Sequence, residues 1–561
     1  MTNMCTHLKA WGLLGFMCSL ILTACGNTPA IDMAIPTDVA TTTDEDATIP
    51  AIPNERTASN DIPDAGGRLV IALSAEPDTL DLYKSSLSVS DTVGSHIGAA
   101  LIAKDAEGQI VPYLAEEWDV SADGLTYTFI IKEGINFHDN TPLTTEDLAY
   151  SFNRARDPET ASPVSGFFVK DLAMAEALDE RTLQLTLNQP SFYFLNTLTV
   201  SDGYLMPISQ RSIEETGDAF GRKPISVGPY MLKEWQTGDR IVLQRNPDFT
   251  WGPDFWGDNA PYIETIEYRI IPENATILAG LESGEVDVAN VQGREAPRLE
   301  ASGFQVFSAS AQGPLYLNMN TSQPPFDDVL VRRAFSFAVD RHALIKIAAN
   351  DAATPQYGPL SASQAGYWPG GEKQGYQFNL EQAKQTMIEA GYTLEADGTL
   401  TRDGTPFELI LVFPAGGEVV ARVAQVLQEQ FKALGVQLEL QQEESSTYYT
   451  NLNQGAYPLS ITGISYPDAT MLELMFHSEG SLNSAQVRDP ELDELLKNIS
   501  STVDPQEQQE WANQTQQYII EQAYFIPLWT AQSFTIINNR VNNVTFADPY
   551  MFLQSAHIAP E

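Results

Sequence analysis

The chain has 561 residues, of which 43% are hydrophobic and 10% aromatic, enough for about three domains with hydrophobic cores. Its 74 acidic residues outnumber 31 lysines and arginines, which gives a formal net charge of -43 at pH 7. Nucleic acids and anionic lipid surfaces bind basic faces, so this balance argues against both as partners. All three cysteines lie at or before Cys25, and the six histidines have no metal-ligand spacing. We therefore expect no disulfide in the rest of the chain, no metal site and no cofactor.

Residues 1–24 have the plan of a secretory signal peptide, with Lys9 followed by an apolar run from Trp11 to Leu22. The run is too short for a stable membrane-spanning helix. Leu-Thr-Ala directly before Cys25 resembles a bacterial lipobox, in which the cysteine becomes the lipidated first residue of the mature protein. An ordinary signal peptide with an incidental cysteine is the alternative. We predict lipidation at Cys25 and a protein held at the outer side of a membrane.

The segment that follows is predicted to be a disordered tether. Residues 26–67 contain no aromatic side chain, and Arg56 is their single basic residue. Such a segment cannot bury enough apolar surface to offset the entropy of ordering it. Residues 25–65 should therefore be a tether with a typical reach of roughly 35 Å.

The folded part begins with a predicted strand after Arg68, and further elements follow in chain order. Asp123-Gly124 predicts a turn before a strand over Leu125–Ile131, in which threonines alternate with aromatic residues. Thr144 and Asp147 have the spacing of a helix capping box. A strand is predicted over Thr182–Leu187, and a short one over Ile241–Leu243 after the turn at Gly228-Pro229.

A stretch just past the middle of the chain combines a predicted strand, a turn and the starts of two helices. Residues 315–319 alternate as a half-buried strand does, and Pro324-Pro325 prevents its continuation. Asp327 or Asp328 can cap the helix that follows, and Asp340 can cap a second one. In the first of these helices apolar side chains should face inward and two arginines outward; the residues concerned are Val331, Ala334, Phe335 and Ala338, and Arg332 and Arg333.

The C-terminal half alternates between helices and strands, which predicts an α/β lobe distinct from the first. One helix, from Asn379 to Gly391, should direct Ala383, Met387, Ile388 and Ala390 inward. The other predicted elements are strands at Phe407–Phe413, Val436–Leu440 and Phe525–Trp529, and helices at Ala421–Leu434 and Gln508–Gln522.

Phrases spread over the whole length resemble the family 5 extracellular solute-binding proteins, the oligopeptide- and dipeptide-binding components of ABC importers. The resemblance runs from about Gly67 to the C-terminus. The phrases, in order, are VPYLAEEWDVSADGLTYTF from Val111, Val227-Gly228-Pro229-Tyr230, Arg245-Asn246-Pro247, Gly284-Glu285-Val286-Asp287, Asn318-Met319-Asn320 with PPFDD, VRRAFSFAVDR from Val331, and Phe525–Trp529.

This resemblance implies an α/β protein with the two-lobed periplasmic-binding-protein fold, of type II and the large three-domain variety, with two hinge crossings. The first lobe would contain a main domain of residues 66–92, 214–311 and 531–561 and an extra domain of residues 93–213. The second lobe would be residues 312–530. The central strand would then be one hinge crossing.

The resemblance also implies a function. The protein would be the substrate-binding lipoprotein of an ABC importer, a monomer that captures a peptide-like solute by hinge closure and delivers it to the membrane permease without catalysing a reaction. A non-peptide solute, such as an oligosaccharide or a nickel complex, is one alternative. An extracytoplasmic hydrolase with a pair of carboxylates is the other, because acids are abundant; nucleophile elbows and phosphate-binding loops are absent from the sequence.

The predicted solute site departs from the family pattern at residues 463–468. In peptide-binding members an aspartate there holds the terminal amine of the peptide, whereas Ser465 precedes Tyr466 in this chain. A neutral hydroxyl cannot replace a carboxylate, so Asp468 would take over only if its loop turns it inward. The other predicted solute contacts, implied by the same resemblance, are Leu87, Ser88, Tyr316, Asn318, Tyr357, Trp368 and Trp529.

Overall fold

The computed structural model describes residues 66–105, 108–191, 194–199, 204–256, 260–415, 417–464, 466, 468–502, 504–547 and 550–559. The predicted signal peptide, the predicted lipidation site Cys25, the predicted tether and Ser465 lie outside the described residues. Within the described ranges, no helix is long and apolar enough to cross a bilayer.

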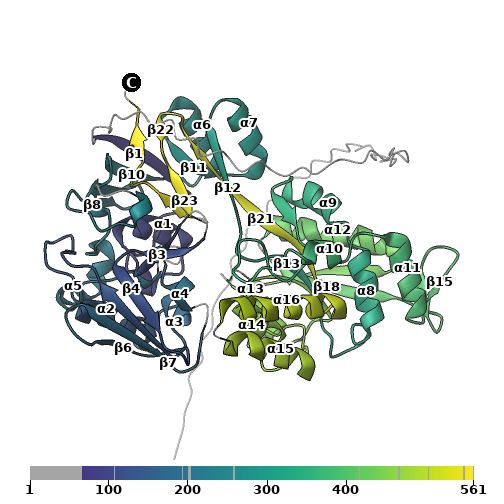
Figure 1. Ribbon diagram of the computed structural model, residues 1–561. Helices are drawn as coiled ribbons and strands as arrows, with labels where there is room; N and C mark the ends of the chain where they lie inside the picture. The colour runs from purple at the N-terminus through teal and green to yellow at the C-terminus, as the bar shows by residue number, and fades with distance from the viewer. Residues whose placement is uncertain are drawn as a thin grey trace, which may run out of the picture. The chain divides into compact units, whose positions relative to one another are not determined.

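A single mixed sheet of 12 strands extends through both lobes (Figure 1). Its strands in spatial order are β19 (Gln437–Glu443), β18 (Glu408–Pro414), β20 (Leu459–Gly463), β13 (Leu315–Met319), β21 (Phe525–Ile537), β11 (Val288–Val291), β1 (Gly66–Leu73), β10 (Ile263–Ile270), β9 (Arg240–Arg245) and β8 (Tyr230–Gln236). The strands β12 (Gln305–Ser310) and β14 (Ala353–Pro355) add to β21.

The long strand β21 belongs to both lobes. Its first part pairs antiparallel with β13 and β14, and its second part, from Gln532 to Ile537, pairs antiparallel with β12 and β11. The chain also passes from β12 to β13 through a short segment. These two passages correspond to the two crossings that the resemblance implied, whereas the residue limits of the three domains remain predictions.

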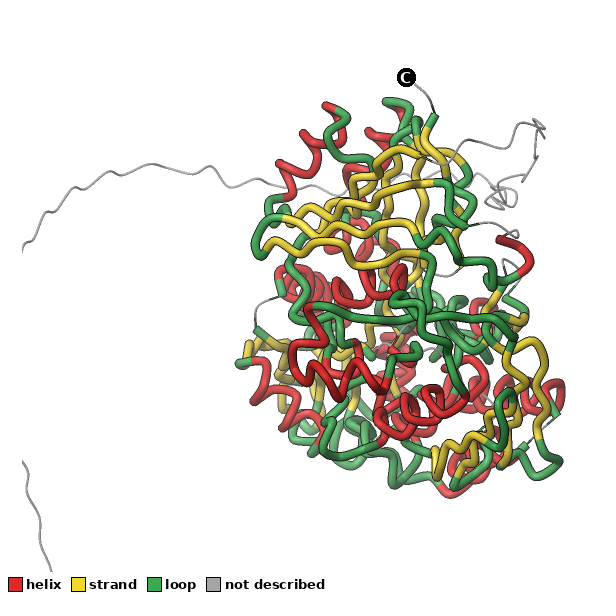
Figure 2. The backbone as a smooth tube through the Cα atoms, turned by 90° about the vertical axis from the view of Figure 1, so that its left-hand side faces the viewer, coloured by secondary structure: helices red, strands yellow, loops and turns green. Residues whose placement is uncertain are grey.

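The main domain of the first lobe buries both faces of its sheet. Leu69 and Ile71 of β1 pack in a core with Val93 of α1 (Ser88–Ile97). Ala72 points to the other face, where it packs with Ile277 of α6 (Asn274–Ser283). Figure 2 shows the neighbouring strands as a yellow layer with helices beside it. Side chains alternate along a strand, so two helical layers can cover one sheet.

The extra domain is a separate four-stranded antiparallel sheet with its own core. Its strands in spatial order are β4 (Ala115–Val120), β5 (Thr126–Ile131), β7 (Thr182–Leu187) and β6 (Leu172–Ala177). Tyr127 and Phe129 are buried and the threonines between them are not, as the alternation predicted. The helix α2 (Thr145–Arg156) begins with the predicted capping box of Thr144 and Asp147.

The second lobe is built on the parallel pair β18 and β19, which α12 (Glu418–Leu434) connects. Asp328 caps α8 (Val329–Phe337) and Asp340 caps α9 (Arg341–Leu344), both as predicted. The other helices of this lobe are α10 (Gly371–Gln374), α11 (Leu380–Glu389), α13 (Ser445–Asn453), α14 (Thr470–Phe476), α15 (Pro490–Ser501), α16 (Pro505–Gln522) and the π-helical η6 (Ile345–Ala349).

The remaining elements are short. The helices are α3 (Ser165–Phe168), α4 (Phe194–Thr197), α5 (Gln210–Thr216) and α7 (Ala296–Ala301), with single turns η1 (Leu82–Lys84), η3 (Gly217–Arg222), η4 (Asp254–Trp256) and η5 (Gly293–Glu295). The strands are β2 (Ile102–Lys104), β3 (Ile110–Pro112), β15 (Thr393–Leu394), β16 (Leu400–Arg402), β17 (Thr405–Pro406), β22 (Val541–Asn542), β23 (Thr545–Ala547), β24 (Tyr550–Phe552) and β25 (His557–Ile558).

Two predicted side-chain directions are wrong. Arg332 was expected to face outward, but it is buried under the end of α16, where its guanidinium donates to the carbonyl oxygens of Gln522 and Phe326. Ile388 was expected to face inward, but it is 46% exposed. The buried face of α11 consists of Ala383, Thr386 and Met387. It is therefore narrower than the set of apolar positions from which the inward face was predicted.

Candidate functional site

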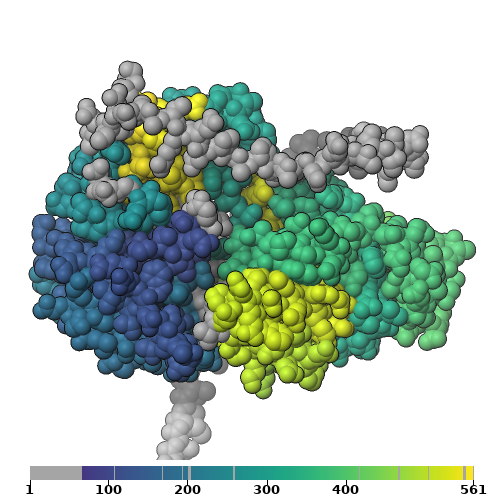
Figure 3. Space-filling view, in the orientation of Figure 1, coloured from purple at the N-terminus to yellow at the C-terminus, as the bar shows by residue number. Residues whose placement is uncertain are grey.

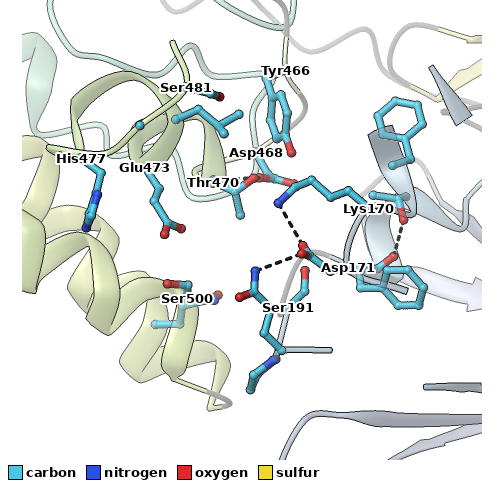
Figure 4. A pocket seen from close by; sticks show the side chains of 18 of the residues that line it. Lys170, Asp171, Ser191, Tyr466, Asp468, Thr470, Glu473, His477, Ser481 and Ser500 are labelled. Carbon is cyan, nitrogen blue, oxygen red and sulfur yellow. Dashed lines mark hydrogen bonds and ion pairs between the residues drawn. The ribbon is translucent and has the colours of Figure 1, made fainter. Parts of the chain in front are cut away.

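A pocket of about 370 Å³ is lined by both lobes, and we call it the inter-lobe pocket (Figure 4). The extra domain of the first lobe contributes residues from two segments, 168–171 and 189–197. The second lobe contributes residues between 466 and 481 and two side chains from α15 and α16. In the space-filling view these blue and yellow-green surfaces face each other across a seam (Figure 3).

The charged lining of the inter-lobe pocket is mostly acidic. The carboxylates are those of Asp171, Asp468, Glu473 and Glu479, and Lys170 is the sole lysine or arginine among the described residues that line it. The Nζ atom of Lys170 lies 3.0 Å from Oδ2 of Asp171. Gln189 donates from Nε2 to Oδ1 of the same carboxylate at 3.0 Å. The lining therefore offers more negative than positive charge to an occupant.

Asp468 lines the inter-lobe pocket, but its side chain is almost fully buried. It lies just before α14. Its Oδ1 atom accepts from the backbone nitrogen of Thr470 at 2.8 Å and from the hydroxyl of Thr470 at 2.5 Å. Burial raises the pKa of Asp468 to about 6, against the opposing effects of the Thr470 hydrogen bonds and of the charges on Lys104 and Lys170. This carboxyl group can thus gain or lose a proton near neutral pH.

The loop that carries Asp468 is anchored to the hinge region. The backbone nitrogen of Tyr466 donates to the carbonyl oxygen of Gln312, between β12 and β13, at 2.7 Å. Gln364 donates from Nε2 to the carbonyl oxygen of Tyr466, also at 2.7 Å. The two predicted solute contacts Tyr466 and Asp468 therefore lie together at the inter-lobe pocket, and the backbone at Tyr466 is held where the chain crosses between the lobes.

Ser88 lies in a second cavity, which we call the first-lobe cavity. It has a volume of about 380 Å³ and is lined by the end of β1, by β11, by α1 along its length and by β21. The lining is rich in hydroxyl groups and includes Asn290. Burial lowers the pKa of His96, which lines it, to about 4, so this imidazole is neutral at pH 7. Leu87 is 40% exposed beside Ser88.

Three of the predicted solute contacts are enclosed in the protein core. Tyr316 is fully buried and donates its hydroxyl to the carbonyl oxygen of Pro359 at 2.7 Å. Asn318 donates to the hydroxyl of Ser460 and accepts from that of Ser484, each at 3.2 Å. Trp529 packs in the core of the second lobe. In this structure these side chains support the hinge strands rather than face a cavity, and we propose no solute contact for them.

Tyr357 and Trp368 are half-buried in the second lobe. The guanidinium of Arg341 lies 4.7 Å from the ring centre of Tyr357, a cation–π contact that fixes this ring. Neither residue is part of the lining of the inter-lobe pocket or of the first-lobe cavity.

Sequence reasoning missed Lys170, Asp171 and Glu473. They lie outside the phrases that carry the family resemblance, and the first two lie in another lobe from the third. No local pattern marks them, since only the folded chain brings them to one pocket. Across the residues that the structure describes, no group of three or more His, Cys, Asp or Glu side chains is arranged to hold a metal ion.

Comparisons with known proteins agree with this architecture. A family model described as bacterial extracellular solute-binding proteins, family 5 Middle, matches residues 109–483. The chain is similar to the periplasmic oligopeptide-binding protein OppA of Salmonella typhimurium, with 26% identity over 508 residues, 85% of this chain and 89% of that protein. It is also similar to the glutathione-binding protein GsiB of Escherichia coli O1:K1, with 27% identity over 481 residues, 83% of this chain and 89% of that protein.

Among solved structures, the fold matches that of the oligopeptide-binding protein AppA from Bacillus subtilis in complex with a nonapeptide. The TM-score is 0.67 with 24% sequence identity, and the match covers 89% of this chain and 100% of the other. At this identity the likeness concerns the fold.

Proposed function

Since this chain belongs to the family 5 bacterial extracellular solute-binding proteins, we propose that its solute is a short peptide or another peptide-like molecule with a free amine, bound in the inter-lobe pocket. The family membership makes the protein a substrate-binding receptor of an ABC importer. Which solute it carries is the proposal.

The acidic lining of the inter-lobe pocket is the observation that carries this proposal. Ser465 cannot bind an ammonium as a carboxylate does, but Asp468 reaches the pocket from three positions later in the chain. Glu473 stands beside it on α14. An ammonium that donates to these carboxylates would form charge-assisted hydrogen bonds, which are about twice as strong as neutral ones. The amine-binding role would thus have moved along the loop.

Size and relatives support the same class of solute. A volume of about 370 Å³ lies in the usual range of small-molecule sites and suits a solute of a few residues. Two relatives are named as oligopeptide-binding and glutathione-binding proteins, and the solved AppA structure holds a nonapeptide. Of the predicted solute contacts, we retain Tyr466 and Asp468, which line this pocket; Ser88 lines the first-lobe cavity instead, with Leu87 beside it.

The test is mass spectrometry of small molecules that co-purify with the protein, followed by thermal unfolding with peptide pools. Mixed short peptides in the co-purified fraction would support the proposal. Recovery of a sugar or a metal chelate, together with no stabilisation by any peptide pool, would contradict it and favour a non-peptide solute. We propose that the protein is no enzyme, so peptides should be recovered intact after incubation; hydrolysis products would favour the carboxylate-pair hydrolase.

We also propose that Cys25 carries a lipid that holds the receptor at the membrane beside its permease. The Cys25→Ser variant should move from the membrane fraction to the soluble extracytoplasmic fraction, because the thioether to the lipid cannot form on serine. Fractionation followed by immunoblotting measures this. Cys18→Ser, within the predicted signal peptide, is the matched control and should leave the distribution unchanged. Membrane association that persists in Cys25→Ser would contradict the lipid anchor.

A further inference from the structure

Among the described residues that line the inter-lobe pocket, which we have assigned to an ammonium group, Lys170 is the sole lysine or arginine. It follows α3 in the extra domain, and its side chain reaches toward Asp468 with the Nζ atom beside Asp171 (Figure 4). A lysine side chain ends in an ammonium on a flexible stem, the same group that ends a peptide or an amine solute. The pocket thus already contains an ammonium group that belongs to the protein, and this is the kind of group that its carboxylates can bind.

The charge of Lys170 acts on both lobes. It forms an ion pair at 3.0 Å with Asp171 on its own lobe. On the other lobe, burial is the main influence on Asp468 and raises its pKa, while the positive charges of Lys104 and Lys170 act in the opposite direction. The ammonium of Lys170 therefore lies within electrostatic range of carboxyl groups on both walls of the pocket.

The ion pair that holds Lys170 is replaceable. The side chain of Lys170 is 43% exposed and that of Asp171 is 24% exposed, so water screens the pair. No other hydrogen bond of the Lys170 side chain is recorded among the described residues, whereas Asp171 keeps a second partner in Gln189. Lys170 can therefore leave Asp171 while the carboxylate stays in position.

We propose that Lys170 is a specificity-determining residue whose ammonium stands beside Asp171, facing Asp468, in the empty pocket and leaves Asp171 when the ammonium of the solute binds between the two walls. The proposal rests on the proposed function, because it assumes an amine-bearing solute in this pocket. Once displaced, the Lys170 ammonium needs a new negative partner. A solute that carries a carboxylate a short distance from its ammonium supplies one, whereas a purely cationic solute leaves the Lys170 ammonium without a partner and close to a second positive charge.

The Lys170 side chain would therefore make the protein prefer zwitterionic solutes over cationic ones. The test uses three related probes: trialanine, its C-terminal amide and its N-acetyl derivative, each titrated calorimetrically into the full-length protein. The wild-type protein should bind trialanine more tightly than the amide. In Lys170→Met, which keeps the length of the stem, the ratio of the two affinities should fall about fivefold to tenfold, mainly because the amide binds better.

Two variants serve as controls. Lys104→Met removes a lysine that acts on Asp468 but is not part of the pocket lining, and should leave the affinity ratio unchanged within about twofold. Lys170→Arg keeps the charge and should restore the wild-type ratio.

The outcomes separate this inference from the proposed function. An unchanged ratio in Lys170→Met, with trialanine still bound, would overturn the role of Lys170 and leave the peptide proposal intact. Equal binding of the N-acetyl derivative to the wild-type protein would show that no ammonium position exists, which overturns the inference and the amine site together. Failure of all three probes to bind would contradict the peptide proposal and with it the inference.

Discussion

Asp468 has a structural role in its local sequence and, in the folded chain, a second role as part of a pocket. Its hydrogen bonds to Thr470 at the start of α14 are those of a structural aspartate. The folded chain nevertheless places the same carboxyl group in the lining of the inter-lobe pocket and shields it from water. Burial therefore makes one aspartate both a helix support and a titratable group that a solute can contact.

The raised pKa of Asp468 predicts a pH-dependent contribution to stability. The folded-state pKa is about 6, above the ordinary value of 3.8, so the folded protein binds this proton more tightly than the unfolded chain does. The resulting stabilisation is complete below pH 3.8 and is lost as the pH rises through about 6. Asp468→Asn does not titrate but keeps an oxygen acceptor for Thr470.

Between pH 4 and pH 7, the free energy of unfolding of the wild-type protein should therefore fall relative to that of Asp468→Asn, by on the order of 2 kcal/mol. Urea unfolding at a series of pH values measures it. Subtracting the variant removes the titration of all other groups. A difference that does not change with pH would contradict the buried, protonatable state of Asp468.

At the scale of elements, two arginine contacts, one buried and one exposed, join helices that are far apart in the sequence. Arg332 on α8 donates from Nε and Nη2 to the carbonyl oxygen of Gln522, the last residue of α16. Carbonyl groups at a helix C-terminus have no partner within the helix, so an arginine from another element can satisfy them. Arg333 makes a similar contact with Glu521, but at the exposed side.

Replacing Arg332 should therefore destabilise the second lobe far more than replacing Arg333. In Arg332→Leu the buried carbonyl oxygens of Gln522 and Phe326 lose their donors, and unfolding should become easier by about 2–4 kcal/mol. In Arg333→Leu the carbonyl oxygen of Glu521 keeps the hydroxyl of Tyr376 as a donor, at 3.3 Å, so the loss should stay below about 1 kcal/mol. Chemical denaturation of both variants measures the difference, and equal losses would contradict the burial of Arg332.

At the scale of the whole molecule, the strand β21 and the passage from β12 to β13 are shared by the two lobes. With the solute bound in the inter-lobe pocket, as proposed, both lobes would contact it and binding would stabilise the arrangement in which they face each other. The importer would then distinguish loaded from empty receptors by this arrangement.

Solute binding should consequently raise the stability of both lobes together. At a free solute concentration of 100 times Kd, the free energy of unfolding should rise by about 2.7 kcal/mol. Differential scanning calorimetry with trialanine should show the whole transition moving to higher temperature. The N-acetyl derivative at equal concentration is the control and should cause little shift. A solute that shifts only part of the transition would show binding to one lobe alone.

Much of the fold could be predicted from the sequence because its signals are local. The caps at Asp328 and Asp340, the capping box at Thr144 and the strand at Thr182–Leu187 depend on residues within one or two turns of each other. The family phrases added the order of the elements, and the family model and the fold comparison confirm that reading.

The tertiary structure alone decided which of these residues meet. Tyr316 alternates correctly in its strand, yet neighbours from distant segments enclose it. Arg332 lies at an outward helical position until the end of α16 covers it. Lys170 carries no sequence signal, and it faces Asp468 across the inter-lobe pocket because strands shared by the two lobes hold these lobes together. Periodicity and capping act within a few residues, whereas burial, charge and the membership of a pocket depend on contacts between segments that only the complete fold brings together.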